Sequence, residues 1–509
     1  MKKIVCITAA CMALTLTACD DYLTVSSPDN LTSESFWRDK TDVEAAISAA
    51  YSQLYFMDSS KDKWTMCEVL WPVEAYREDL VKPGNDAMNY QNWVELYNFT
   101  YTNGNSQFSN YWRHLYRGAN FASQILEKMA KVPTDKLSDD ERTRLQAEAH
   151  FLRGYYHMRL LLNWEQIIIR DKYITSGDRA ALDKALSARP DCWDFIIGEL
   201  QAATALPKAY GPDDVGRATS GAAYAYLGWA WLTRAAEEKK TEYLTKAVEA
   251  FDKVTGYELV GDFASMFNGQ DKNSRESIFE VQFTLNDANG ANYRTQMHRW
   301  IGCSELKGWD EILPSKALMD EYMKEGQTAL NGLYDNRLYN TVFYQCDYWN
   351  DASGRVYGKK YDDWFRNDGG AYNRPAFRKF MPATIEGLEQ DNTAINIPLM
   401  RYANVLLMKA EALNNLGETA KAITLINEVR KVHGNMPPMQ GTGQSEVQAQ
   451  IEHERAIEFP LENLRFYDLR RWGKLGVVLK ADGRTNFDEA TNSFYPVPQT
   501  EINSNGLVN

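Results

Sequence analysis

The chain has 509 residues, 44% of them hydrophobic, which is enough to bury a large core in one big domain or two. It carries 56 basic and 69 acidic residues, for a formal net charge of −13. Nucleic-acid binders are usually basic, so this balance disfavours a nucleic acid as the partner. After the N-terminal segment, no apolar run approaches the length of a membrane-spanning helix.

The first eighteen residues have the pattern of a targeting segment that is removed from the mature protein. Lys2 and Lys3 precede an apolar stretch over 4–16 that is too short to span a membrane. Leu16-Thr17-Ala18-Cys19 is the order of residues that a lipoprotein signal peptidase cuts. We therefore predict that Cys19 becomes the acylated first residue and anchors the chain to a bilayer, and loss of the two lysines lowers the net charge to −15. An ordinary secretory signal with a chance cysteine is the alternative.

After a polar tether over residues 19–40, helical patterning begins near Asp42. Apolar residues then recur at i, i+3, i+4 and i+7, the spacing of one helix face. We expect strands only at 277–283 and 338–343. The expected helices are Tyr111–Ala130, Asp140–Trp164, Asp191–Ala205, Ser220–Ala236, Glu242–Val254, Met400–Leu416, Thr419–Val432 and Glu446–Phe459.

Two of the expected helix pairs, over 400–432 and 227–254, fit the spacing of a tetratricopeptide hairpin. Ala410 and Ala422 stand where that repeat needs small residues, because its two helices cross closely there. The alternative is a pair of generic helical hairpins. We predict a mostly helical chain with a degenerate tetratricopeptide-like array, which presents surfaces for partner proteins.

Aromatic residues are concentrated in the segments between these helix pairs. Residues 331–380 hold thirteen, or 26% against 12% for the whole chain, and residues 64–116 hold twelve. Both segments also carry many Asn, Asp, Gly and Arg residues. We therefore expect a single domain over 41–509 with two parts. These are a helical scaffold at about 41–60, 105–260 and 398–475, and a loop-rich lobe at about 61–104 and 261–397.

Several motifs occur in order along the chain: Ala147–Tyr156 (AEAHFLRGYY), Asp335–Arg337 (DNR), Arg401–Leu413 (RYANVLLMKAEAL), Glu454–Phe459 (ERAIEF), Arg465–Gly473 (RFYDLRRWG) and Tyr495–Ile502 (YPVPQTEI). Together with the lipoprotein signal, they resemble the SusD/RagB family of nutrient-binding outer-membrane lipoproteins. The resemblance implies a SusD-like fold, with a mostly helical tetratricopeptide-like scaffold that carries a variable loop lobe.

The resemblance also implies a partner and a location. The protein would act as a lid on a SusC-like TonB-dependent outer-membrane transporter and face the cell exterior. Asp20 and Asp21, directly after Cys19, are similar to the export signals of surface lipoproteins. In the helical motifs, Glu454, Arg455, Glu458, Arg470 and Arg471 are expected to form a structural ion-pair network rather than a catalytic site.

No motif for an enzyme is present. The six histidines form no HExxH pattern, and there is no nucleophile elbow, P-loop or GxGxxG. We therefore predict no catalytic residue, no metal and no cofactor. Four cysteines remain after Cys19, none in a CxxC pair, so a zinc site is not expected and disulfide pairing stays open: Cys67, Cys192, Cys303 and Cys346.

The aromatic segments contain the residue types that bind sugars. Trp and Tyr rings cover the apolar face of a sugar ring, while Asp, Asn and Arg bind its hydroxyl groups. Family relatives that bind glucans draw their site residues from two of these regions. The resemblance thus implies a site at Arg77, Trp93, Asn98, Tyr293, Trp300 and Trp309. Further candidates are Glu68, Trp71, Asp79, Tyr97, Trp364 and Arg366. For any single tryptophan, core packing is an equal alternative.

These observations predict a cell-surface lipoprotein that binds an oligo- or polysaccharide and delivers it to a transporter. A peptide-binding lipoprotein, as on the RagB side of the family, is the alternative, and it would use an apolar groove and backbone hydrogen bonds. A glycoside hydrolase is a third hypothesis, because carboxylates are numerous enough for a pair to stand at catalytic separation by chance.

Overall fold

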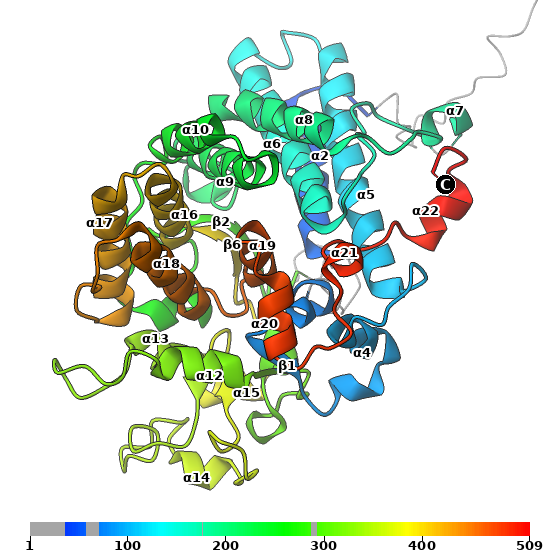
Figure 1. The fold of residues 1–509 in the computed structure, drawn as a ribbon. Helices are drawn as coiled ribbons and strands as arrows, with labels where there is room; N and C mark the ends of the chain where they lie inside the picture. Colours follow the sequence, from blue (N-terminus) through cyan, green and yellow to red (C-terminus); the bar gives the residue numbers. More distant parts are fainter. Residues whose placement is uncertain (1–35, 57–70, 176, 287–292, 509) are drawn as a thin grey trace, which may run out of the picture.

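A computed structural model describes residues 36–56, 71–175, 177–286 and 293–508. Helices predominate, as the periodicity predicted, and the strands are few and short (Figure 1). Within the described ranges, no helix is both long enough and apolar enough to cross a membrane. The predicted lipid-anchor segment, including Cys19, lies outside the described residues.

The N-terminal half of the scaffold is a series of helices that pack against their neighbours in the chain (Figure 1). Each expected helix of this region is present, with ends shifted by a few residues. Ser138 caps the N-terminus of helix α6 and forms a capping box with Glu141, which satisfies two free backbone N–H groups. The helices are α2 (Lys40–Ser52), α5 (Ser106–Lys128), α6 (Asp139–Asn163), α8 (Arg189–Ala202), α9 (Ser220–Glu238) and α10 (Thr241–Phe251).

The two predicted hairpins are α9–α10 and α16–α17, formed by α16 (Tyr402–Asn415) and α17 (Thr419–Val429). Ala410 and Ala422 are fully buried where the second pair crosses. In the first pair, a Cβ on Gly228 would stand 2.4 Å from the Phe251 ring, so only glycine allows this close approach. The tetratricopeptide-like scaffold is therefore confirmed.

The strands form three separate two-stranded antiparallel sheets. Strand β2 (Ser277–Val281), predicted from the sequence, pairs with β6 (Ile397–Arg401), so the chain leaves and re-enters the scaffold at one place. The other pairs are β1 (Val81–Pro83) with β3 (Ile312–Pro314) and β4 (Val342–Phe343) with β5 (Ala376–Phe377).

The strand expected at 338–343 was wrong over most of its length. Residues Asn336–Thr341 form helix α13, and only Val342–Phe343 are extended. The helix begins there because the Asp335 carboxylate accepts a hydrogen bond from the backbone N–H of Arg337. This cap outweighs the strand preference of the apolar residues that follow.

The loop-rich lobe contains short elements that lie together at the bottom of Figure 1. Its helices are α11 (Met297–Ile301), α12 (Lys316–Met323), α13, α14 (Tyr361–Trp364) and α15 (Ile385–Glu389), and the 3₁₀ segment η7 (Phe263–Phe267) precedes them. The remaining helices are α4 (Gln91–Asn98), α7 (Arg179–Leu182), α18 (Gln444–Glu458), α19 (Arg465–Arg471), α20 (Leu475–Ala481), α21 (Glu489–Asn492) and α22 (Gln499–Ser504).

Three cysteines lie within the described residues, and none forms a disulfide. Cys192 and Cys303 are buried and Cys346 is half-buried. Burial raises the pKa of the Cys192 thiol to about 11, so it carries no thiolate at neutral pH. Cys67 lies outside the described residues.

Candidate functional site: a pocket in the loop lobe

Three of the six predicted site residues lie inside the protein. Arg77 and Trp300 are fully buried and Trp93 is 4% exposed. The structure does bring two of them together, since the ring centres of Trp93 and Trp300 are 6.1 Å apart, but Tyr76 and Trp71 complete a closed aromatic cluster around them. In this conformation all three side chains belong to the core.

The contacts of the Arg77 side chain explain why this charged residue is buried in the core. Its guanidinium carbon lies 4.1 Å from the ring centre of Phe466 and 4.3 Å from that of Tyr495. One terminal nitrogen donates to the side-chain oxygen of Asn163 at 2.6 Å. Stacking and a hydrogen bond therefore hold the cation between two aromatic faces and away from solvent.

The other three predicted residues are half-buried but lie on different elements. Asn98 ends helix α4, and its carbonyl accepts a hydrogen bond from Asn486. The ring of Tyr293 lies 5.0 Å from that of Tyr55, which follows α2. Trp309 follows α11, and its backbone N–H donates to the carbonyl of Arg299. We find no single pocket that these three residues line together among the described residues.

The further candidates are also divided between core and surface. Trp71 is fully buried, and Asp79 is buried with an ion pair to Arg465 at 2.9 Å. The ring of Tyr97 lies 3.4 Å from the guanidinium carbon of Arg484. Trp364 is half-buried and donates to the carbonyl of Val356, Arg366 is exposed, and Glu68 lies outside the described residues.

The lobe contains a pocket of about 270 Å³, which we call the lobe pocket. Its walls come from η7, the end of α13, strand β4, the 354–358 turn and the segment 378–383. Its polar, charged and aromatic lining residues are Phe267, Asn268, Asn340, Phe343, Arg355, Tyr357, Arg378, Lys379 and Phe380. Four aromatic residues, two amides, two guanidinium groups and one lysine thus line one concavity.

A tight turn brings Arg355 and Tyr357 to the rim of this pocket. The Gly358 N–H donates to the carbonyl of Gly354 at 2.9 Å, and a Cβ on Gly354 would stand 2.6 Å from the Gly358 backbone. Gly354 and Gly358 both have positive φ angles, which glycine adopts without strain. The hydroxyl of Tyr357 donates to the carbonyl of Pro382 at 2.8 Å, so the turn is tied to the opposite wall.

The short β4–β5 pair positions Arg378. The residue follows β5 directly, and its backbone N–H donates to the carbonyl of Thr341 at 2.8 Å. One guanidinium nitrogen donates to the carbonyl of Tyr339 at 2.7 Å and to the side-chain oxygen of Asn340 at 3.2 Å. Burial lowers the pKa of Arg378, but an arginine remains charged at neutral pH.

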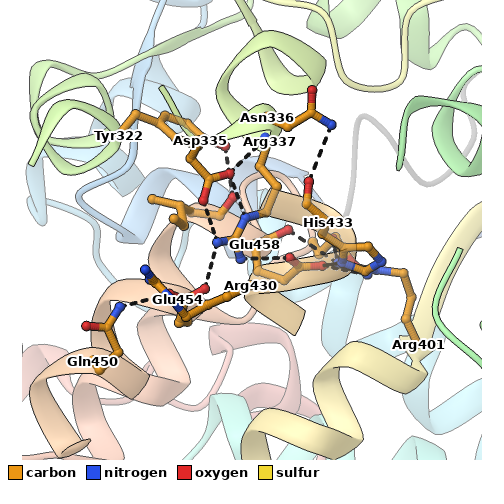
Figure 2. Close-up of polar contacts among 12 residues, drawn as sticks. Tyr322, Asp335, Asn336, Arg337, Arg401, Arg430, His433, Gln450, Glu454 and Glu458 are labelled. Atoms are coloured by element: carbon orange, nitrogen blue, oxygen red, sulfur yellow. Dashed lines mark hydrogen bonds and ion pairs between the residues drawn. The ribbon is translucent and has the colours of Figure 1, made fainter. Parts of the chain in front are cut away.

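A buried ion-pair network lies beside the lobe pocket and joins the lobe to the scaffold (Figure 2). Arg337 of the lobe donates to Asp335 at 2.7 Å, and it contacts Glu454 at 2.6 Å and Glu458 at 3.0 Å on α18. Lys379, which also borders the pocket, pairs with Glu462 at 2.6 Å. Ordered carboxylates on the scaffold thus fix the lobe segments that form the pocket wall.

The predicted structural role of the motif charges is confirmed for most of them. Glu454 and Glu458 pair with Arg337, while Arg455 and Arg471 both pair with Asp468. Arg470 differs, because one of its terminal nitrogens donates to the backbone carbonyls of Leu162 and Ser493. These are internal contacts that stabilise the helical motifs.

The protonation state of His433 decides whether this part of the network could bind a metal. Its two ring nitrogens lie 2.9 Å from Glu458 and 3.0 Å from Glu276, and all three residues are fully buried. The two carboxylates outweigh burial and raise the pKa of His433 to about 9. The cluster has metal-ligand residue types, but a doubly protonated imidazole has no free lone pair for a metal.

The second cluster with metal-ligand residue types is also occupied by cations. Glu325 and Glu454 share Arg430, at 2.9 Å and 2.5 Å. His453 lies 2.7 Å from Glu321. Guanidinium groups therefore supply the positive charge that a metal would bring, and both clusters are structural.

Sequence reasoning missed Arg355, Tyr357 and Arg378 as residues of one pocket. The available signal was the aromatic enrichment at 331–380, which marked the correct segment. It did not single out these positions, because their meeting depends on the Gly354–Gly358 turn and on the β4–β5 pairing.

Comparison with family models covers most of the chain in two parts. Residues 275–509 match the model of the SusD family. Residues 21–232 match a model described as starch-binding and associating with the outer membrane. Over nearly its full length, the chain is similar to the SusD-like protein P2 of Formosa agariphila. The two are 27% identical, over 99% of this chain and 98% of that protein.

Solved structures show the same fold. A SusD superfamily protein from Bacteroides vulgatus superposes with a TM-score of 0.79 at 25% identity, over 93% of this chain and 99% of that one. The surface glycan-binding protein A from Bacteroides thetaiotaomicron, solved in complex with laminarihexaose, gives a TM-score of 0.71 at 19% identity. That match covers 91% of this chain and 97% of the other, and it bears on the fold alone.

Proposed function

Because the chain belongs to the SusD/RagB family, as its motifs predicted, we propose that it binds glycans at the outer membrane. The lobe pocket is the observation that carries this proposal. The half-buried ring of Tyr357 provides an apolar face for a sugar ring, while the amides of Asn268 and Asn340 match its hydroxyl groups.

The size of the pocket indicates how much of a glycan it holds. Its volume of about 270 Å³ is just below the roughly 300–1,000 Å³ of pockets that bury a drug-sized ligand. The pocket therefore takes a single sugar unit or a short end of a chain, and the rest of the glycan extends into solvent.

The names of similar proteins support the same ligand class. One family model is described as starch-binding, and a structural neighbour was solved with laminarihexaose. The partly exposed residues Asn98, Tyr293 and Trp309 stay within the proposal as secondary contacts outside the pocket. Arg77, Trp93 and Trp300 are left out because they are buried.

We further propose that Cys19 carries the lipid anchor, that the protein faces the cell exterior, and that it hands its ligand to a SusC-like TonB-dependent transporter. The family model associated with the outer membrane supports the location. A tagged protein extracted in mild detergent should co-purify with an outer-membrane barrel, and recovery of the protein alone would contradict the partnership.

Affinity electrophoresis against a panel of plant, fungal and host polysaccharides tests the ligand class. Retardation by at least one polysaccharide, lost in a Tyr357→Ala variant that a thermal melt shows to be folded, is the expected result. Retardation by none, together with binding of peptides, would favour the RagB-like alternative. We propose that the protein is not an enzyme, and turnover of a bound polysaccharide would overturn that part.

A further inference from the structure

The lobe pocket is lined by cations and by no carboxylate. Arg355 and Arg378 border it, and none of its lining residues is Asp or Glu. Neutral sugars are usually bound with carboxylates among the hydroxyl acceptors, since an ionised carboxylate accepts at two oxygens. This pocket offers guanidinium donors instead. It stands out against a chain whose formal net charge is −13.

Neither arginine is neutralised by an ion pair within the described part of the chain. The guanidinium carbon of Arg355 lies 4.4 Å from the ring centre of Tyr348, and the side chain is exposed. One terminal nitrogen of Arg378 donates to two neutral acceptors, the backbone carbonyl of Tyr339 and the side-chain oxygen of Asn340. Lys379 differs, since it is buried and paired with Glu462, and it adds no free charge to the pocket.

Two aspartates interact electrostatically with these arginines without forming ion pairs. Burial lowers the pKa of Arg378, and Asp262 opposes this effect only in part. Hydrogen bonds from Ser353 lower the pKa of Asp351, and the charge of Arg355 adds to this lowering. Neither aspartate forms an ion pair with these arginines or lines the pocket. Two guanidinium groups therefore face a concavity that also contains aromatic rings and amides.

We propose that the lobe pocket binds a sugar unit that carries an anionic group, so that the protein selects acidic over neutral glycans. This inference rests on the proposed function. A planar guanidinium matches the paired oxygens of a carboxylate or a sulfate, and such charge-assisted hydrogen bonds are about twice as strong as neutral ones. The Tyr357 ring would cover the apolar face of the same sugar.

The acidic character of the rest of the molecule sharpens this inference. A protein of strongly negative net charge repels a polyanionic glycan, so its overall charge would not attract such a ligand. Binding of an acidic glycan therefore requires a local positive site. The lobe pocket is a place where the described structure combines such charge with a concavity.

Calorimetry on the mature full-length protein tests the inference with three probes of similar chain length. These are an oligogalacturonate for the carboxylate, a sulfated galactan oligosaccharide for the sulfate, and a neutral galactan oligosaccharide. We expect at least one acidic probe to bind at least about tenfold more tightly than the neutral one, with an affinity that falls as NaCl is raised. The comparison between the two acidic probes shows which anion fits.

Charge-removing variants locate the effect. Arg355→Gln and Arg378→Gln should each weaken acidic binding by about tenfold. Lys131→Gln, which removes an exposed charge after α5, is the matched control and should bind like the wild type. A thermal melt accompanies each variant. Arg378 also supports Tyr339, so Arg378→Gln can lose its fold, whereas the exposed Arg355 does not pack in the core. If Arg378→Gln is unfolded, the binding measured for Arg355→Gln decides the test.

The outcomes separate the two proposals. Neutral glycans bound as tightly as acidic ones, or acidic binding that both arginine variants keep, would overturn the charge selection and leave the glycan-binding function standing. No binding of any glycan, in this assay and in the polysaccharide panel, would overturn both.

Discussion

The contribution of His433 to the stability of this protein should fall as the pH rises from 6.5 to 8. The folded state raises the pKa of His433 to about 9, whereas an unfolded histidine has a pKa of about 6.5. The folded state therefore holds the proton more tightly. The stabilisation is fully present below pH 6.5 and is lost as the pH rises through 9.

The size of the effect follows from the shift. One pKa unit corresponds to about 1.4 kcal/mol, so the raised pKa is worth about 3 kcal/mol when the proton is fully bound. About half of this, roughly 1.5 kcal/mol, should be lost between pH 6.5 and 8. The window ends at 8 because burial lowers the pKa of Lys379 to about 8. Its deprotonation above that pH relieves a buried charge and opposes the trend.

Urea unfolding at a series of pH values measures the effect, with fluorescence and circular dichroism compared to check that the transition is two-state. In His433→Gln, Arg401 still bridges Glu276 and Glu458, at 2.6 Å and 2.9 Å, so the variant should fold with lower stability and without the pH slope. The control is His298→Gln. Burial lowers the pKa of His298 to about 4, so this variant should keep the slope. Equal pH dependence of stability in the wild type and in His433→Gln over this window would refute the reasoning.

Three further predictions follow from single residues. Cys19→Ala should abolish acylation and move the protein to the aqueous phase of a detergent separation; a variant that still carried lipid would contradict the anchor. Trp93→Ala should lower stability by roughly 3–5 kcal/mol in a denaturant melt, because Trp93 is 4% exposed, and a melt like the wild type would show that it is not a core residue. Gly228→Ala should destabilise by about 1–3 kcal/mol, since the new Cβ would meet the Phe251 ring at 2.4 Å. Gly198→Ala, on an exposed position of α8 with open space around it, should instead stabilise by up to about 1 kcal/mol, so equal effects of the two substitutions would be inconsistent with this packing.

The helical scaffold could be predicted because helices leave a local signal. Apolar residues at a spacing of 3.6 gave the ranges of α6 and α9 to within a few residues, and small residues such as Ala410 marked a helix crossing. The motif charges were also interpretable. Charged residues on otherwise apolar helices need partners, and Glu454 and Glu458 have them.

The candidate site was harder to predict, because burial of an aromatic residue depends on contacts between distant parts of the chain. Nothing near Trp93 in the sequence shows that Trp300 covers it. The lobe also lacks long periodic elements, so the N-cap at Asp335 was enough to turn an expected strand into α13. The meeting of Arg355 and Arg378 likewise depends on the Gly354–Gly358 turn and on a two-residue strand pair.

The pairing of β2 with β6 has a consequence for how the lobe can vary. Val281 is opposite Ile397 in the sheet, so the chain departs from the scaffold and returns to it between adjacent strands, roughly 5 Å apart. An inserted segment whose two ends are held together costs the scaffold little when its length or composition changes, since the cost of closing a loop grows only slowly with length. The scaffold would then accept inserted ligand-binding segments of different length and composition. Such a segment would need only a few contacts to fix its position on the scaffold. The buried ion pairs of Arg337 with Glu458 and of Lys379 with Glu462 are contacts of this kind.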